Sequence, residues 1–124
     1  MKIDENSQVP IFIQIANALE DQILKEVYQE DDRIPSTNEL AQYLQINPHT
    51  VLKGMNLLVD EGLLYKKRGV GMFVTKDALS MIREKRIRKF QEEFIQPLIQ
   101  ESQTLGLTLG EIQKMIQHEI DKGE

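Results

Sequence analysis

The sequence predicts a mainly α-helical protein with one small β-hairpin and a C-terminal pair of helices. Three observations predict this fold class. Apolar residues recur at helical spacing in three segments before residue 62, alternate with a period of about two between residues 63 and 75, and return to helical spacing from about residue 77. The change of period in the middle of the chain is the main signal for the hairpin.

The first helix should begin at Pro10, where the missing N–H of proline costs nothing. Apolar side chains then recur every four residues, at Ile11, Ile15, Leu19 and Ile23. We expect this helix to end near Lys25. The polar residues 28–33 and the pair Ile34-Pro35, whose proline disfavours helix in the residue before it, predict a loop.

Two capping signals predict a pair of short helices after this loop. Ser36 and Glu39 have the spacing of a capping box, in which each side chain accepts a hydrogen bond from the backbone N–H of the other residue. Asn47-Pro48 supplies a second N-cap followed by proline at the first helical position, and Gly62 should close the third helix just after Asp60. Two helices joined by a turn of about three or four residues form a helix-turn-helix.

A β-hairpin is expected directly after this motif. Residues 63–68 and 72–75 form its two predicted strands, on either side of Gly69-Val70-Gly71. A hairpin in this position is a wing, so we expect a winged helix-turn-helix over residues 1–75. Gly54 lies inside the third helix, where glycine costs about 1 kcal/mol relative to alanine, and close helix packing is the favoured reason for it.

Residues 76–124 are expected to form a helical dimerisation domain of two helices. Pro97 predicts a kink or a break near Gln96, and Thr108 and Glu111 repeat the capping-box spacing at the start of the last helix. So short a segment cannot bury much core of its own. A second copy of the chain should therefore cover its apolar side chains, and the alternative is that the segment folds back on the first domain. The expected interface residues are Phe90, Phe94, Ile95, Leu98, Ile99, Ile112, Met115 and Ile116.

The composition excludes several classes of protein. The net charge is −5, but residues 63–90 hold nine basic and two acidic side chains, so a local basic block can meet phosphates while acidic faces point away. No cysteine is present, which excludes disulfides, thiolate zinc sites and a cysteine nucleophile. No apolar run approaches the roughly 20 residues of a membrane span, and the N-terminus lacks a signal-peptide core. We expect a soluble cytoplasmic protein with no membrane partner.

The chain carries no constellation of side chains that predicts catalysis. Its two histidines, His49 and His118, stand far apart in the sequence without a matching acid or nucleophile. We therefore expect no catalytic residue, no metal ligand, no cofactor and no enzymatic activity.

Four short strings resemble the GntR family of bacterial transcription regulators, and they occur in the order seen in that family. Residues 10–15, PIFIQI, are similar to P-L-Y-x-Q-I, and residues 34–41, IPSTNELA, are similar to L-P-S-x-R-E-L-A. Residues 47–51, NPHTV, resemble the N-P-N-T-V of the YtrA-like subfamily. EGLL at 61–64, followed by GVGMFV at 69–74, resembles E-G-L-I followed by G-x-G-T-F-V. The short helical tail is similar to that of the same subfamily.

The resemblance implies a sequence-specific DNA-binding transcription regulator that acts as a homodimer and as a repressor, and it suggests a transporter operon as the target. A two-fold dimer would present its two third helices about 34 Å apart, which predicts a palindromic operator. The alternative is a winged-helix module that binds another protein without specific DNA binding. No residue identifies a small-molecule effector.

The resemblance also assigns the expected DNA contacts. The front of the third helix should read bases in the major groove through His49, Thr50 and Lys53, with a plain surface histidine as the alternative for His49. Polar groups at helix starts should contact the DNA backbone, although Ser36 could serve only as a cap. These backbone residues are Ser36, Thr37, Asn38 and Asn47.

The wing should approach a minor groove, or else be an ordinary hairpin with a basic edge. Its expected contact residues are Lys66, Lys67, Arg68, Gly69 and Gly71. Relatives commonly carry a basic residue where this sequence has Asn38, Leu52 and Val70, so fewer charges reach the DNA here. The basic residues of the following helix could flank the DNA or only keep the helix soluble, and we favour the second; they are Arg83, Lys85, Arg86, Arg88 and Lys89.

Overall fold

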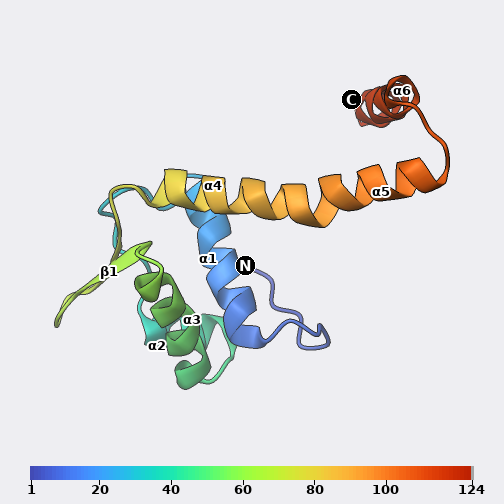
Figure 1. The fold of residues 1–124 in the computed structure, drawn as a ribbon. Coiled ribbons are helices and arrows are strands. Elements are labelled where there is room, and N and C mark those ends of the chain that lie inside the picture. The colour runs from blue at the N-terminus through green and yellow to red at the C-terminus, as the bar shows by residue number, and fades with distance from the viewer. Residues whose placement is uncertain (124) are drawn as a thin grey trace. The chain divides into compact units, whose positions relative to one another are not determined.

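The computed structural model describes residues 1–123, and the chain divides into two compact units between Glu84 and Lys85. Unit 1 holds three helices, a hairpin and the start of a fourth helix (Figure 1). This order confirms the predicted mainly α-helical fold with one small hairpin. The elements are α1 (Ile11–Leu24), α2 (Thr37–Leu44), α3 (Pro48–Asp60), β1 (Leu64–Lys67), β2 (Gly71–Val74) and α4 (Ala78–Phe90).

The core of unit 1 combines apolar side chains from all of these elements. Ile15 of α1 and Val51 of α3 are fully buried within it. Ala78 and Ile82 of α4 are also fully buried in the same cluster. Burial of one such aliphatic side chain contributes about 1.5–3 kcal/mol relative to leaving it exposed. The first two turns of α4 therefore belong to the core of unit 1, which explains why the boundary between the units lies inside this helix.

The helix starts follow the capping signals in the sequence. The Ser36 hydroxyl accepts a hydrogen bond from the Glu39 N–H (3.1 Å), and the Ser36 N–H donates to Glu39 Oε1 (3.2 Å). Asn47 caps α3 by accepting from the His49 N–H at 2.8 Å. The turn between α2 and α3 passes through Gln45, whose backbone is left-handed, with φ 56°. These contacts are local, so the sequence could predict the two helix starts and the turn between them.

The hairpin is part of a larger extended structure than the sequence predicts. β1 and β2 pair antiparallel, with Leu64 opposite Val74 and Lys67 opposite Gly71. The backbone of residues 31–34 runs along the other edge of β2, where Val74 donates to Asp32 (3.0 Å) and Ile34 donates to Met72 (3.0 Å). Part of the loop expected at residues 28–33 is therefore extended backbone that anchors the wing from its second side.

Unit 2 consists of the end of α4, a π-helical turn η1 (Gln91–Ile95), α5 (Gln96–Thr104) and α6 (Leu109–Lys122). The irregularity expected near Gln96 is this π-helical turn, in which the Gln96 N–H donates to the Gln91 carbonyl five residues earlier. Pro97 has no N–H for the ordinary α-helical bond, and a wider turn before it lets the helix continue. Thr108 and Glu111 form the predicted capping box at the start of α6.

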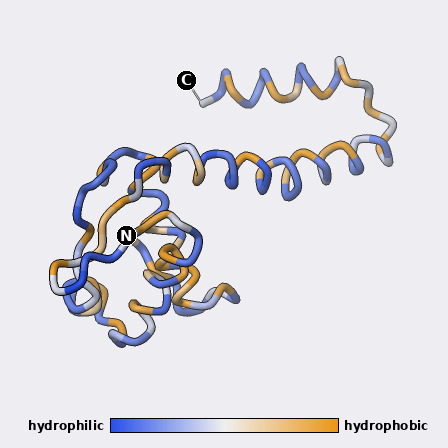
Figure 2. The backbone as a smooth tube through the Cα atoms, turned by 60° about the vertical axis from the view of Figure 1, so that its left-hand side comes forward, coloured by the Kyte–Doolittle hydropathy of each residue, from blue (hydrophilic) through white to orange (hydrophobic). Residues whose placement is uncertain are grey.

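Over residues 85–123, unit 2 buries no apolar side chain of its own. Its one buried residue among those described is Ser102, whose hydroxyl donates to the Ile99 carbonyl at 2.7 Å. Apolar residues nevertheless recur turn by turn along its helices, as Figure 2 shows. Among residues 1–123, no helix combines the length and the apolar character that a membrane span requires.

Candidate nucleic-acid interface

The front of α3 presents the residues that the sequence predicts as base readers. His49 and Lys53 are exposed and Thr50 is half-buried, whereas Val51 on the opposite face is fully buried. The Lys53 ammonium lies 4.1 Å from the centroid of the Phe12 ring of α1, which is close enough for a cation–π contact. The ring thus holds the ammonium of this exposed lysine beside α1.

Gly54 fixes the distance between α3 and α1. A Cβ atom at this position would lie 2.7 Å from the Phe12 carbonyl oxygen and 3.2 Å from Ile15 Cβ. Because the nearest atom belongs to the backbone of α1, only glycine allows the two helices to pack this closely. This confirms the prediction that Gly54 serves helix packing, and it ties the position of the predicted reading helix to α1.

A groove of about 400 Å³ lies between the start of α2 and the wing. It brings together two sets of predicted DNA-contact residues that stand 30 positions apart in the sequence. Its lining includes Ser36, Thr37, Asn38, Lys66, Lys67, Arg68, Gly69 and Gly71. His49, Thr50 and Lys53 do not line this groove; they lie on α3, so the predicted contacts form two surfaces of unit 1.

The polar groups at the start of α2 differ in what they can offer a ligand. Ser36 uses its oxygen to accept the cap bond and keeps its hydroxyl hydrogen for another acceptor. The Thr37 hydroxyl instead lies 3.4 Å from the Met55 sulfur and donates to it. Asn38 is exposed at the mouth of the groove. Ser36 and Asn38 are therefore better placed than Thr37 to donate to an anion.

The wing is packed at Lys67 and open two residues later, at Gly69. The Lys67 ammonium lies 4.6 Å from the Phe73 ring centroid, and Tyr65 stacks on Phe73 with centroids 5.6 Å apart. At Gly69, with φ +77°, a Cβ would meet no atom within 4 Å. The wing turn at Gly69 is therefore open to a close approach from outside, whereas Lys67 lies over an aromatic pair.

Arg33 is a residue of this region that the sequence analysis missed. Its Nε–H donates to the Val70 carbonyl at 3.2 Å, and its Nη2 lies 3.8 Å from Glu39 Oε1. Arg33 stands 37 positions before Val70, so no local pattern could have predicted the contact. The nearest signal in the sequence is the single positive charge within an otherwise acidic loop.

The capping carboxylate of α2 is held in its ionised form. Backbone and side-chain hydrogen bonds from Ser36 lower the pKa of Glu39 below its usual value of 4.5, and the positive charge of Arg33 lowers it further. At the far side of the wing, the hydrogen bond from the Tyr65 hydroxyl to Asp31 (2.7 Å) raises the pKa of Tyr65. Both groups therefore stay in the protonation states that these contacts need at neutral pH.

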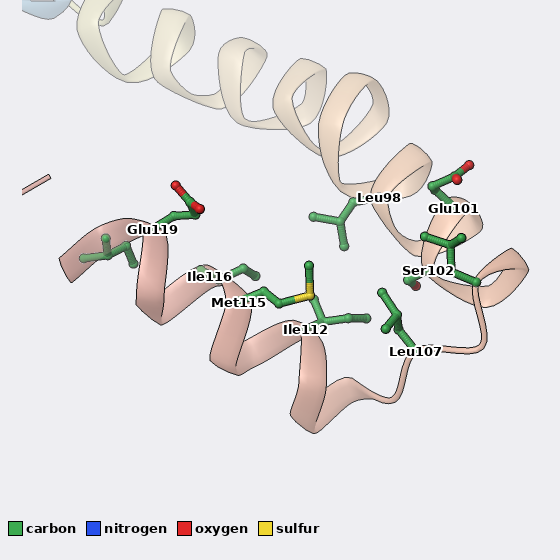
Figure 3. Close-up of a pocket in the computed structure, with 10 residues that line it drawn as sticks. Leu98, Glu101, Ser102, Leu107, Ile112, Met115, Ile116 and Glu119 are labelled. Carbon is green, nitrogen blue, oxygen red and sulfur yellow. The ribbon is translucent and has the colours of Figure 1, made fainter. Parts of the chain in front are cut away.

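The eight residues expected at a dimer interface all belong to unit 2. Seven of them are exposed by 37–61%, and Ile112 is half-buried. Figure 3 shows a groove between α5 and α6 into which Leu98, Ile112 and Met115 point. Its volume is about 530 Å³, and Leu107 and Ile116 also line it.

Comparison with known proteins decides the family. The model of the bacterial regulatory proteins of the gntR family matches residues 13–74, which is half of the chain and spans α2, α3 and the wing. The chain belongs to the GntR family. It is 30% identical over 116 residues to the HTH-type transcriptional repressor YtrA of Bacillus subtilis, and the match covers 94% of this chain and 88% of YtrA. This GntR protein is therefore a YtrA-like, DNA-binding transcription regulator and not an enzyme.

Solved structures of GntR proteins share its fold. A GntR-family transcriptional regulator from Bacteroides thetaiotaomicron is 34% identical, with a TM-score of 0.78 over 92% of this chain and 99% of that chain. The DNA-binding domain of AraR in complex with an operator is 31% identical, with a TM-score of 0.55 over 60% of this chain and 93% of that chain. Several other matched regulators are longer, and this chain spans only about a third of the length of each.

Proposed function

We propose that this GntR protein represses transcription as a homodimer that binds a palindromic operator. The observation that carries the proposal is the front of α3, where His49, Thr50 and Lys53 reach the surface. Gly54 allows this helix to pack closely against α1. An α-helix fits the major groove of B-DNA, and a lysine there can donate to guanine O6 or N7. The named role of YtrA as a repressor supports the direction of regulation.

Backbone contacts would come from the groove between the start of α2 and the wing. The free hydroxyl hydrogen of Ser36 and the exposed amide of Asn38 face it from one side, and Lys66 and Arg68 from the other. Helix N-termini favour anions because their backbone N–H groups and dipole point at the ligand. The open turn at Gly69 would enter the adjacent minor groove, with Arg68 beside it.

A second copy would bind through unit 2. The residues of this unit that the structure describes bury no apolar side chain, although Phe94, Met115 and others are largely exposed. An apolar groove lined by two helices has the composition of a dimer interface core. Two-fold pairing through these helices would bring two copies of α3 to one face of the DNA, and this is the physical reason to expect a palindrome.

Lys53→Ala tests the reading helix. The substitution should weaken specific binding by about 1–3 kcal/mol, or roughly 5- to 150-fold, in a mobility-shift titration on DNA upstream of the protein's own gene. Because Lys53 also contacts Phe12, its unfolding transition is measured alongside. Lys25→Ala is the matched control, since Lys25 is an exposed lysine at the end of α1. An unchanged affinity for Lys53→Ala would show that α3 does not read the bases.

Ile116→Glu tests the dimer. A carboxylate on the apolar side of α6 should shift sedimentation from dimer to monomer, because an unpaired charge is costly to bury in an interface. Gln113→Glu places the same charge at an exposed position of α6 outside the groove lining and should leave the dimer intact. Wild-type protein that sediments as a monomer at micromolar concentration would contradict the proposal.

The regulated genes are expected to include a transporter operon, which the resemblance to YtrA-like regulators suggests. Action on chromosomal DNA would place the protein in the cytoplasm. The described residues contain no cluster of histidine and acidic side chains that could hold a metal ion. Mapping of the occupied sites in the genome tests the choice of target.

A further inference from the structure

Arg33 joins three parts of unit 1 that are separate in the sequence. Its backbone lies on the extended segment beside β2, where it bridges to Phe73. Its Nε–H donates to the Val70 carbonyl at the wing turn, and its Nη2 lies beside Glu39 of the capping box. One side chain thus connects the wing turn with the start of α2, on the two sides of the groove proposed to bind the DNA backbone.

Gly71 leaves the space that this side chain occupies. A Cβ at Gly71 would lie 2.7 Å from Arg33 Nε and 3.4 Å from its Cδ. Such close approach is not available to any other residue type without displacing the arginine. The glycine that was expected to let the wing approach DNA therefore has an internal role, and the open position of the wing is Gly69.

The ion pair between Arg33 and Glu39 is long and exposed. The Nη2–Oε1 distance is 3.8 Å, and the two side chains are 48% and 61% exposed. Exposed pairs of this kind contribute little to stability. The bond from Nε to the Val70 carbonyl is better formed and acts on a turn of only three residues between the strands, so its main effect should be on the position of the wing turn.

We propose that Arg33 is a positioning residue, which holds the wing turn against the start of α2 so that both contact DNA as one surface. The expected effect of Arg33 on DNA affinity rests on the proposed function. Its effect on the position of the wing turn does not. The obvious alternative is that Arg33 itself binds a phosphate, because half of its side chain is exposed. The two roles differ in whether Arg33 acts through the wing.

The first experiment uses the full-length protein without DNA. ¹⁵N relaxation should show lower order parameters for the amides of Gly69 and Val70 in Arg33→Gln than in the wild type. Lys25→Gln removes one exposed positive charge elsewhere in unit 1 and should leave both amides unchanged. Equal order parameters in the wild type and in Arg33→Gln would overturn the proposal.

The second experiment is a double-mutant cycle on DNA binding, with Arg68→Ala as the partner substitution in the wing. Arg33→Gln alone should weaken binding about three- to tenfold, the range that loss of one hydrogen bond gives. In the Arg68→Ala background, the effect of Arg33→Gln on binding should fall below about twofold, because the contact between the wing and DNA that Arg33 supports is already lost. Effects that simply multiply would show that Arg33 contacts DNA directly and would overturn the proposal. Failure of the wild type to bind DNA would instead reject the proposed function, while the relaxation result still decides the role of Arg33.

Discussion

Gly54→Ala is the sharpest test of how unit 1 positions its reading helix. The added Cβ would lie 2.7 Å from the Phe12 carbonyl oxygen and 3.2 Å from both Ile15 Cβ and Ile15 Cγ2. Overpacking of a core contact costs about 1–3 kcal/mol. The upper part of that range applies here, because the nearest atom is backbone and cannot rotate away. The higher helix propensity of alanine offsets about 1 kcal/mol of this overpacking cost.

The expected net effect of Gly54→Ala is thus a loss of about 1–2 kcal/mol in the free energy of unfolding. For a unit of this size such a loss lowers the Tm by roughly 4–16 °C, which circular dichroism or calorimetry resolves easily. The shift of α3 away from α1 should also weaken specific DNA binding, measured on the same protein by mobility shift.

Gly110→Ala provides a matched control for Gly54→Ala. Gly110 lies in the first turn of α6, and its nearest atom to an added Cβ is Thr108 Oγ1, at an ordinary 3.9 Å. The same substitution should there be neutral or stabilising by up to about 1 kcal/mol. A Gly54→Ala protein as stable as the wild type would refute the claim that this glycine sets the distance between α1 and α3.

Two further predictions concern the capping boxes. Ser36→Ala removes the acceptor for the Glu39 N–H and should lower the free energy of unfolding by about 1 kcal/mol in urea titrations; no change would mean that the cap is not needed for α2. Hydrogen bonds from Ser36 and Thr108 lower the folded-state pKa values of Glu39 and Glu111, respectively, below 4.5. The stability that these two carboxylates contribute to the fold is therefore fully present above pH 4.5, and it is lost as the pH falls through the lowered pKa values. The difference in stability between the wild type and Glu39→Gln should therefore be largest at neutral pH and vanish in acid, and a difference independent of pH would contradict this origin.

The parts of the fold that depend on neighbouring residues could be predicted from the sequence. The capping boxes at Ser36 and Thr108 and the N-cap at Asn47 each need only two to four adjacent residues, and the structure confirms all three. Gly54 could be predicted as a packing residue because glycine inside an apolar helical pattern needs a reason. The sequence pattern does not show that Gly54 packs against α1.

The features that the sequence did not predict depend on contacts between distant residues. The extended backbone at residues 32–34 forms only because β2 offers it a second edge, and the loop itself carries no strand pattern. Arg33 belongs to the candidate site through Val70, a residue of the wing that could not be paired with it in advance. The irregularity caused by Pro97 could be placed to within a few residues, but a local pattern does not distinguish a π-helical turn from a break.

Selection of genomic fragments by the purified protein at moderate ionic strength tests most directly whether α3 reads DNA sequence from a two-fold dimer. We predict enrichment of fragments that share a palindromic site whose half-site centres are about one helical turn, or roughly 10 base pairs, apart. Retained fragments no different in sequence from random duplex would contradict the account.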